Sequence, residues 1–249
     1  MALVGKIHTK DEVETKLNEG MLDGWEKASY EGFRDSLVKG NSYPCHFGSK
    51  AQRQGNARYL FIESMSNEND LMMLRDGIYE YIKMYEEIAK RTTLAIFFKP
   101  PQEKLSESEY RDSFWSILEY LNKNDPEPWP AEVPVDPDDP KWEFCFAGEP
   151  IFLVARAPCY EQRLSRYAPH GLEITVQPRG TLNDITGDTE KGKKAREIIR
   201  AGLQEYDKID PHPDIGDYGD SNTREWKQYF LPDTNDESIC EFPFEIDPK

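Results

Sequence analysis

The clearest periodic pattern along the chain is that of an amphipathic helix over residues 71–88. Apolar residues recur there at helical spacing, directly after asparagines and an aspartate that can cap a helix. A second helix is predicted after Ser106, because Glu109 stands three residues later and the two side chains can form a capping box. A third helix is predicted to begin at Asp188 or Thr189.

Two shorter helical segments are expected nearer the N-terminus. Thr9 can cap the first one, since acidic residues follow it in the first turn. Residues 25–37 repeat apolar side chains at helical spacing, and Gly40 is expected to end this helix. Residues 43–55 form a segment rich in turn-forming residues. The pattern therefore predicts four or five helices.

Short apolar and β-branched runs predict the strands of a sheet. Residues 92–98 are the most continuous run and end at two prolines, which is typical of a buried strand. Residues 142–146 and 151–157 flank Ala147-Gly148-Glu149-Pro150 and predict a hairpin. Two further strands are predicted at residues 59–63 and 173–177.

Helices and strands are mixed without strict alternation, which favours the α+β class over a doubly wound sheet. We expect a single domain over residues 1–249, with a mixed, mostly antiparallel sheet flanked by four or five helices. Residues 125–141, DPEPWPAEVPVDPDDPK, contain too many prolines for a regular element and predict a long acidic loop. The tail, residues 234–249, is acidic and contains prolines, and we expect it to extend over the surface.

Acidic residues outnumber basic residues by 47 to 31, which gives a formal net charge of −16 at pH 7. This charge argues against nucleic acid and anionic membrane surfaces as partners, because both attract clustered lysine and arginine. It is compatible with a small cationic substrate. The apolar runs are far too short to span a bilayer, and no signal-peptide core is visible. Four cysteines without a C-x-x-C pair indicate a reduced, cytoplasmic protein.

Residues 211–233, PHPDIGDYGDSNTREWKQYFLPD, carry the densest group of functional side chains. His212, Asp217, Asp220 and Glu225 stand among prolines and glycines that restrict the backbone or permit unusual angles. Such a loop can hold an imidazole and several carboxylates in fixed positions. An acidic surface loop closed by an aromatic anchor is the alternative, and the segment taken alone favours it.

Cys45 lies between Pro44 and Gly48, directly before a predicted strand, so its thiol is expected at a rigid turn. A thiolate in such a place can bind a soft metal or haem iron. The residue types alone favour a simpler role, in which Cys45 is a small buried apolar side chain and His46 points into solvent.

Arg156, Arg163, Arg166 and Arg179 form the one basic cluster of note in the sequence. Arginine binds carboxylates, including haem propionates, through two parallel hydrogen bonds. The same arginines can instead pair with acidic residues of the loop 211–225, and the sequence does not separate the two roles.

The standard signatures of nucleotide-binding and hydrolytic sites are absent. The sequence has no Gly-rich phosphate loop, no G-x-S-x-G and no H-E-x-x-H. Its four histidines, His8, His46, His170 and His212, are too dispersed to indicate a metal site by their spacing.

An ordered set of short motifs resembles the YqcI/YcgG family. The motifs are Y-P-C-x-F-G at residues 43–48, Phe61-Ile62-Glu63, Ser165-Arg166, Gln177-Pro178-Arg179, and Tyr218-Gly219-Asp220 followed by Glu225-Trp226-Lys227-Gln228-Tyr229-Phe230. They occur in the same order between residues 25 and 233, and the last motif is the most specific. Members of that family from guanitoxin and cycloserine biosynthesis are haem-dependent N-hydroxylases of arginine or arginine-like guanidines. The resemblance therefore implies a haem protein.

The resemblance offers Cys45 and His212 as axial ligands of the haem iron. A thiolate favours cleavage of the O–O bond, whereas histidine is the ligand of globins and peroxidases. The prolines and glycines around His212, and carboxylates able to orient its second nitrogen, favour His212. Arg156, Arg166 and Arg179 are the expected partners of the haem propionates.

A guanidinium substrate needs carboxylates in its pocket, for which Glu63, Asp217, Asp220 and Glu225 are the candidates. The predicted activity is that of a haem-dependent oxygenase, which N-hydroxylates a guanidine or amine of an arginine-like small molecule. The oxidant is O₂ or peroxide, and the sequence does not identify an electron donor. Two alternatives stay open: a haem-binding or haem-sensing protein without turnover, and a non-haem small-molecule binding domain in which the motifs are structural.

Overall fold

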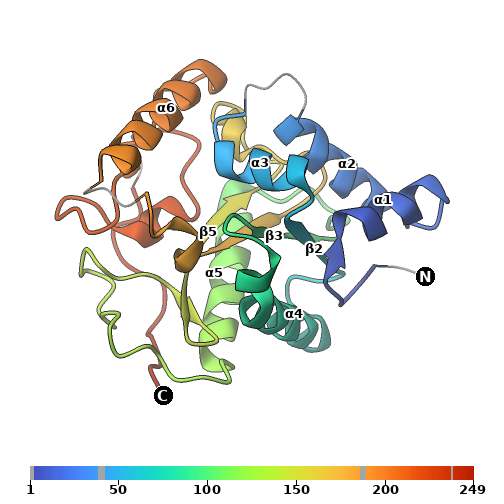
Figure 1. Cartoon of the computed structure of the whole chain (residues 1–249), viewed down its shortest axis with the longest axis horizontal. Coiled ribbons are helices and arrows are strands. Elements are labelled where there is room, and N and C mark those ends of the chain that lie inside the picture. The colour runs from blue at the N-terminus through green and yellow to red at the C-terminus, as the bar shows by residue number, and fades with distance from the viewer. Residues whose placement is uncertain (1–2, 39–42, 186–188, 237) are drawn as a thin grey trace.

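The computed structural model describes residues 3–38, 43–185, 189–236 and 238–249, which fold around a six-stranded sheet (Figure 1). The strand order is β1-β2-β3-β6-β5-β4. The strands are β1 (His8–Thr9), β2 (Ala57–Ile62), β3 (Thr93–Phe98), β4 (Cys145–Phe146), β5 (Glu149–Arg156) and β6 (Glu173–Pro178). β2 and β3 are parallel, and the other neighbouring strands are antiparallel. The predicted α+β class with a mixed, mostly antiparallel sheet is confirmed.

Six α-helices surround this sheet in the described part of the chain, against the four or five expected. They are α1 (Lys10–Asn18), α2 (Gly24–Val38), α3 (His46–Gln54), α4 (Glu68–Ile88), α5 (Glu107–Lys123) and α6 (Glu190–Tyr206). Three 3-10 helices follow later in the chain: η2 (Leu164–Arg166), η3 (Arg179–Leu182) and η4 (Glu225–Gln228). Within the described residues, every helix is too short or too polar to cross a lipid bilayer.

Local capping chemistry sets the starts of four helices. The side chains of Thr9, Asn67, Ser106 and Thr189 each accept a hydrogen bond from a backbone amide in the first turn of the helix that follows. These positions agree with the caps predicted from the sequence. The alternative cap Asp188 lies outside the described residues.

Helix α3 occupies most of the segment 43–55, where we expected turns, so that prediction is wrong. The segment has few apolar residues, so no apolar stripe indicates a helix. The residues that cap its two ends identify the helix instead. Cys45 is the N-cap, and Gly55 ends the helix in the left-handed conformation with φ 74°. Gly40, which we expected to end the preceding helix, lies outside the described residues.

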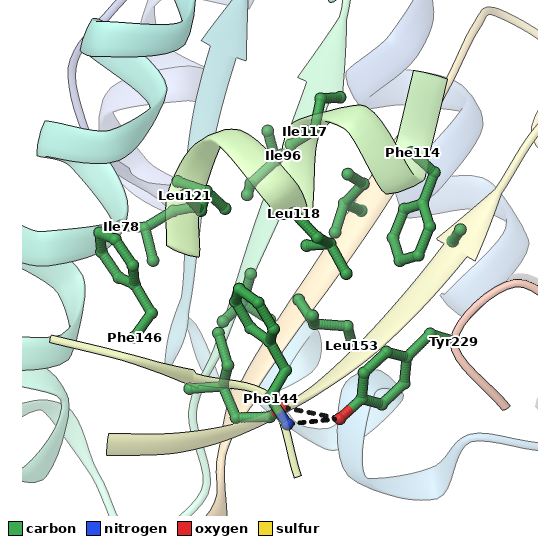
Figure 2. Close-up of a cluster of buried hydrophobic side chains, with 14 of the residues drawn as sticks. Ile78, Ile96, Phe114, Ile117, Leu118, Leu121, Phe144, Phe146, Leu153 and Tyr229 are labelled. Atoms are coloured by element: carbon green, nitrogen blue, oxygen red, sulfur yellow. Dashed lines mark hydrogen bonds between the residues drawn. The ribbon is translucent and has the colours of Figure 1, made fainter. Parts of the chain in front are cut away.

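One face of the sheet carries the larger core cluster, beneath α4 and α5 (Figure 2). Leu118 and Leu121 of α5 lie over Ile96 of β3 and Leu153 of β5, and each of these side chains is 1% exposed. Alternation along the strands places every second residue on this face. Burial of so many large apolar side chains supplies the main stabilisation of the fold.

The opposite face of β2 and β3 packs against α2. Tyr59 of β2 makes an edge contact with Tyr30 at 5.2 Å between ring centres, and Phe97 of β3 makes one with Phe33 at 5.4 Å. Because both faces of β2 and β3 are covered, these strands are the continuous apolar runs seen in the sequence.

The same face of β5 and β6 is covered differently. The core cluster around α2 contains no residue of β5 or β6. Phe152 and Val154 of β5 and Gln177 of β6 point to this side, since they alternate with core residues such as Leu153. Helix α6 stands over this part of the sheet, apart from the other helices (Figure 1).

The loop 125–141 contains no helix or strand, as predicted. The tail, in contrast, does not only extend over the surface. Phe242 contacts the rings of Trp115 and Trp142 at 5.6 and 5.0 Å, and Ile246 is 9% exposed. The expectation is wrong for the apolar residues of the tail, because an extended chain points alternate side chains to opposite sides and one side here meets the core.

We expect Gly171→Ala to lower the free energy of unfolding by about 2–3 kcal/mol, through backbone strain combined with overpacking. Gly171 has φ 130°, and a Cβ there would stand 2.8 Å from the carbonyl oxygen of Phe98 at the end of β3. Gly20→Ala is the matched control, because Gly20 also has a positive φ of 69° but an added Cβ would meet nothing within 4 Å. Urea unfolding of both variants tests this, and equal losses would contradict it.

Candidate functional site

A cavity of about 240 Å³ lies between α6 and the face of β5 and β6 that faces away from α5. Its walls come from segments far apart in the sequence, namely 43–45, β5, 163–166, 177–185, α6, 215–218 and 225–231. The cavity exists because α6 spans this face of the sheet without packing directly onto it.

Apolar side chains form much of the wall. Helix α6 contributes Ala195, Ile199 and Leu203, and β5 contributes Phe152 and Val154. Gly192 is the residue of α6 that is fully buried, so the apolar side of this helix faces the cavity and not a packed core. A helix with such a side is stabilised by an apolar ligand that fills the space beneath it.

Contacts at both ends of α6 hold it across the cavity. Near its C-terminus, a Cβ at Gly202 would stand 3.3 Å from Pro44, and the ring of Tyr206 lies 5.5 Å from that of Tyr43. Towards its N-terminus, Arg196 forms an ion pair with Asp217. The cavity wall around 43–45 and the loop 211–233 are thus joined through α6.

Cys45 lines the cavity and is the N-cap of α3. Its Sγ accepts a hydrogen bond from the amide of Gly48 at 3.4 Å. A Cβ at Gly48 would lie 3.3 Å from that sulfur, so glycine permits the close approach. Amide groups at a helix N-terminus favour a negatively charged sulfur, which suits a thiolate ligand.

Arg179 binds two buried carboxylates at one end of the cavity. Its Nε and Nη2 donate to Glu143 at 2.6 Å each, and Nη2 also donates to Glu225 at 2.7 Å. The guanidinium lies 4.1 Å from the ring centre of Tyr218. Burial raises the pKa of Glu143 to about 8 although Arg179 opposes the shift, and burial also raises the pKa of Glu225. The Arg179 cluster, formed by Arg179, Glu143 and Glu225, therefore keeps a proton at neutral pH.

The sign of charge in the cavity is opposite to that of the whole chain. Among the residues that the structure describes, the lining contains five arginines, Arg163, Arg166, Arg179, Arg196 and Arg200, and two carboxylates, Asp217 and Glu225. Both carboxylates are already paired with arginines. The cavity therefore favours an anionic group, although the chain carries −16 overall.

Of the two proposed axial ligands, Cys45 lines this cavity and His212 does not. His212 is 2% exposed, and its Nδ1 accepts a hydrogen bond from the amide of Asp214 at 3.1 Å. Asp220 also lies outside the lining and accepts a hydrogen bond from the amide of Asn222 at 2.9 Å.

Arg156 and Glu63 also lie outside the lining. Arg156 Nη1 donates to Glu173 at 2.8 Å in a buried ion pair, and its guanidinium lies 5.4 Å from the ring centre of Tyr43. Glu63 is an exposed residue at the end of β2, and its carboxylate lies 3.5 Å from Lys99 Nζ. Arg156 is a support behind the cavity wall, and Glu63 is remote from it.

In the part of the chain that the structure describes, no group of three or more His, Cys, Asp or Glu side chains is arranged to hold a metal ion.

The sequence profile of the YqcI/YcgG family matches residues 33–245. The chain belongs to this family. YcgG of Bacillus subtilis is 33% identical over 246 residues, which cover 97% of this chain and 96% of the relative. YqcI of the same organism is 33% identical over 242 residues, covering 95% and 94%. DcsA of Streptomyces lavendulae, which carries the name of an N(omega)-hydroxy-L-arginine synthase, is 29% identical over 230 residues, covering 90% and 86%. No solved structure matches the chain.

The motifs that carry the YqcI/YcgG resemblance meet in the cavity. Ten of their residues line it: Tyr43, Pro44, Cys45, Ser165, Arg166, Gln177, Arg179, Tyr218, Glu225 and Gln228. These segments, from Tyr43 to Gln228, are 185 residues apart at most in the sequence, and the fold brings them to one cavity. Phe61-Ile62-Glu63 is the motif that lies elsewhere, in the sheet.

Sequence reasoning missed the arginines that α6 contributes. Arg196 and Arg200 are four residues apart and share a helix side with Ala195, Ile199 and Leu203. Basic residues at helical spacing beside an apolar stripe were the available signal. Ile198, which precedes Ile199 in the sequence, is outside the lining and 45% exposed.

Proposed function

We propose that this YqcI/YcgG-family protein is a haem-dependent oxygenase that N-hydroxylates a guanidine or amine of an arginine-like molecule in the cavity beneath α6. The observation that carries the proposal is the meeting of the family motifs in one cavity, which combines a cysteine at a helix N-terminus with apolar walls and arginines. The name of the relative DcsA supports the reaction class.

The donor set of the cavity fits a haem. Cys45 offers a thiolate ligand that the Gly48 amide stabilises. Phe152, Val154 and Leu203 offer apolar walls for a macrocycle, and Arg166 offers a cation for a propionate. The bound haem would supply oxygen activation at its iron.

The size of the cavity sets a condition on haem entry. At about 240 Å³ it lies just below the usual range of small-molecule pockets, ~300–1,000 Å³. A porphyrin therefore requires α6 to move outward. Such a movement would break the contacts of α6 with Tyr43 and Asp217 but would expose little buried core, because few residues of α6 are buried.

N-hydroxylation needs protons as well as electrons. With O₂, the balance is R–NH₂ + O₂ + 2 e⁻ + 2 H⁺ → R–NHOH + H₂O, and the electrons come from an external reductant. With hydrogen peroxide, the balance is R–NH₂ + H₂O₂ → R–NHOH + H₂O. The Arg179 cluster keeps a proton next to the cavity, and Glu225 is its cavity-lining carboxylate. We assign Glu143, whose pKa burial raises to about 8, as the residue that holds this proton, and Glu225 as the cavity-lining carboxylate that passes it on.

Asp217 and Glu225 are the two carboxylates of the cavity that can meet a guanidinium. Each is shared with an arginine, Arg196 and Arg179 respectively. A substrate guanidinium would therefore compete with an internal one for the same carboxylate, and this competition selects for a planar, bidentate cation. The earlier candidates Glu63 and Asp220 have no part in this proposal.

The deciding experiment is a visible absorption spectrum of the protein titrated with haem, for the unchanged chain and for Cys45→Ala. We expect the unchanged chain to give a Soret band, and its ferrous carbon monoxide form to give the red-shifted band of thiolate-ligated haem. Cys45→Ala should lose that band. Cys159→Ala is the matched control, because Cys159 is also half-buried but does not line the cavity.

Three results would contradict parts of the proposal. A band that changes in His212→Ala and not in Cys45→Ala would name histidine as the ligand. A chain that takes up no haem would overturn the oxygenase proposal and leave a non-haem binding domain. A Soret band without a product one oxygen atom heavier than arginine would indicate haem binding without turnover.

A further inference from the structure

Arg163 is the most deeply buried of the arginines in the cavity lining, with 1% of its surface exposed. Its Nε donates to the carbonyl of Pro232 at 2.9 Å, and its Nη2 donates to the side-chain oxygen of Asn235 at 2.7 Å. Its Nη1 has no hydrogen-bond partner. The acceptors are neutral, so a buried positive charge stands without a direct counter-ion, which is costly.

Arg166 and Gln228 have unused donors in the same lining. Arg166 donates to the carbonyls of Tyr229 at 3.2 Å and Gln228 at 2.8 Å, and its Nε has no hydrogen bond within the described chain. Gln228 is 7% exposed, and its Nε2 has no partner either. Two buried donors of cavity-lining residues, Arg163 Nη1 and Gln228 Nε2, therefore have no partner among the described residues, which is rare for buried polar groups, and Arg166 Nε adds a third, less buried donor.

The nearest carboxylates are engaged elsewhere. Asp233 accepts hydrogen bonds from the backbone amides of Gln162 and Arg163 at 3.0 and 2.8 Å. Asp207 accepts from the amide and the hydroxyl of Ser165 at 2.6 and 2.9 Å. Both carboxylates cap the η2 turn, and their charge reaches the two guanidinium groups only at longer range.

We infer that Arg163, Arg166 and Gln228 form a carboxylate-binding subsite, at which a ligand of the cavity supplies the missing negative charge. A carboxylate offers two oxygens that together accept about four hydrogen bonds, which matches a set of three unused donors. The apolar wall of the cavity suits the hydrocarbon part of the same ligand. The inference extends the proposed function to the chemical group that the cavity binds. It rests on the proposed function for the choice of the haem and arginine probes below.

Two sources of such a carboxylate are compatible with the proposed function. One is a propionate of haem, and the other is the α-carboxylate of an amino-acid substrate. Both present the same group to the same donors, so the test must separate them with ligands that differ only in the carboxylate.

Three probe pairs make this separation. Haem is compared with its dimethyl ester by absorbance titration. L-Arginine is compared with agmatine, which lacks the carboxylate, by calorimetry. Octanoate is compared with octanamide by thermal shift, and this pair needs neither haem nor turnover. We expect the carboxylate member of at least one pair to bind about tenfold more tightly or better, since a charge-assisted hydrogen bond contributes that much.

Two variants connect the preference to the subsite. Arg166→Gln and Gln228→Met should each reduce the preference for the carboxylate ligand about tenfold or more. Gln228→Met should not lower the stability of the ligand-free protein, because it removes an unpaired buried donor. Arg58→Gln is the matched control for Arg166→Gln. Arg58 is half-buried and also donates to backbone carbonyls, of Gly55 and Ala57, but lies outside the cavity.

Each outcome has a distinct meaning. A preference confined to the haem pair assigns the subsite to a propionate, and one confined to the arginine pair assigns it to the substrate. If octanoate binds more tightly than octanamide but the chain takes up no haem, the subsite is supported and the oxygenase proposal fails. Equal binding within all three pairs, or inorganic phosphate binding more tightly than the carboxylates, overturns the inference.

Discussion

Arg179→Met is expected to lower the free energy of unfolding by about 3–5 kcal/mol, the usual loss when a buried ion pair loses one partner. Glu143 is fully buried and Glu225 is 7% exposed, and Arg179 is the cation hydrogen-bonded to both. Methionine fills a similar volume but supplies no charge. The variant therefore leaves the ionised carboxylate of the Arg179 cluster without a counter-ion in a region of low dielectric constant, and it also removes the cation that stacks on Tyr218.

Denaturant unfolding at neutral pH measures this loss. Arg75→Met is the matched control, because Arg75 also forms a close ion pair, with Asp76, but on the surface. Surface pairs contribute about 0–1 kcal/mol, so the control should change little. If the two variants lose the same stability, the Arg179 cluster is not a buried ion pair in solution. Adding Glu225→Gln to Arg179→Met should recover part of the loss, because the carboxylate left without its counter-ion becomes neutral.

Much of the local structure was predictable, because the signals act over a few residues. The capping side chains at Thr9, Ser106 and Thr189 mark the starts of helices where the sequence places them. The apolar run at 92–98 became β3, which is buried on both faces. Helix α3 escaped prediction because its signal lies in its caps and not in an apolar stripe.

The candidate site was predictable in part, and the misplaced residues have a common cause. Cys45, Arg166 and Arg179 were singled out from motifs and do meet in one cavity. Arg156 belongs to the same cluster in the sequence, but strand register decides its partner. It stands directly opposite Glu173 where β5 pairs with β6, and the two form an ion pair. Sequence alone does not reveal which residues a strand register brings face to face.

The charge of the site was not predictable from the charge of the chain. An overall −16 suggested a cationic ligand, yet five arginines line the cavity. Net charge is a sum over the whole surface, whereas a ligand feels the groups within about one Debye length, ~8–10 Å. The arginines gather because α6, η2 and η3 each bring one or two of them to the same space.

Raising the pH from 6.5 to 8 is expected to lower the free energy of unfolding by roughly 1–2 kcal/mol, whereas the stability of many proteins changes little over this range. Burial raises the pKa of Glu143 to about 8 and that of Glu173 to about 7, from the ordinary 4.5. Below pH 4.5 both states are protonated and the contribution is fully present. As the pH rises above 4.5 the unfolded chain releases these protons while the folded chain keeps them. The free energy of unfolding therefore decreases as the pH rises, until the pH exceeds the pKa of the carboxyl group in the folded chain.

Other titratable groups limit the pH range in which the loss of stability can be assigned to Glu143 and Glu173. Burial lowers the pKa of His8 below its ordinary 6.5, so its contribution increases with pH and is complete by 6.5. Hydrogen bonds from Thr9 lower the pKa of Glu12, and its contribution is lost only in more acidic solution. Above pH 6.5 the decline therefore reports mainly on Glu143, with a smaller share from Glu173.

Urea unfolding of the unchanged chain and of Glu143→Gln at pH 6.5 and pH 8 tests this assignment. The glutamine is a neutral isostere of the protonated carboxyl that Arg179 binds, so the variant should be as stable as the unchanged chain at the lower pH and more stable at the higher one. Glu63→Gln is a suitable control, since Glu63 is exposed and lies outside the Arg179 cluster and the cavity lining. A profile that rises or stays level in the unchanged chain would mean that Glu143 is ionised in the folded protein. The Arg179 cluster would then hold no proton, and Glu225 could not supply one to a reaction in the cavity.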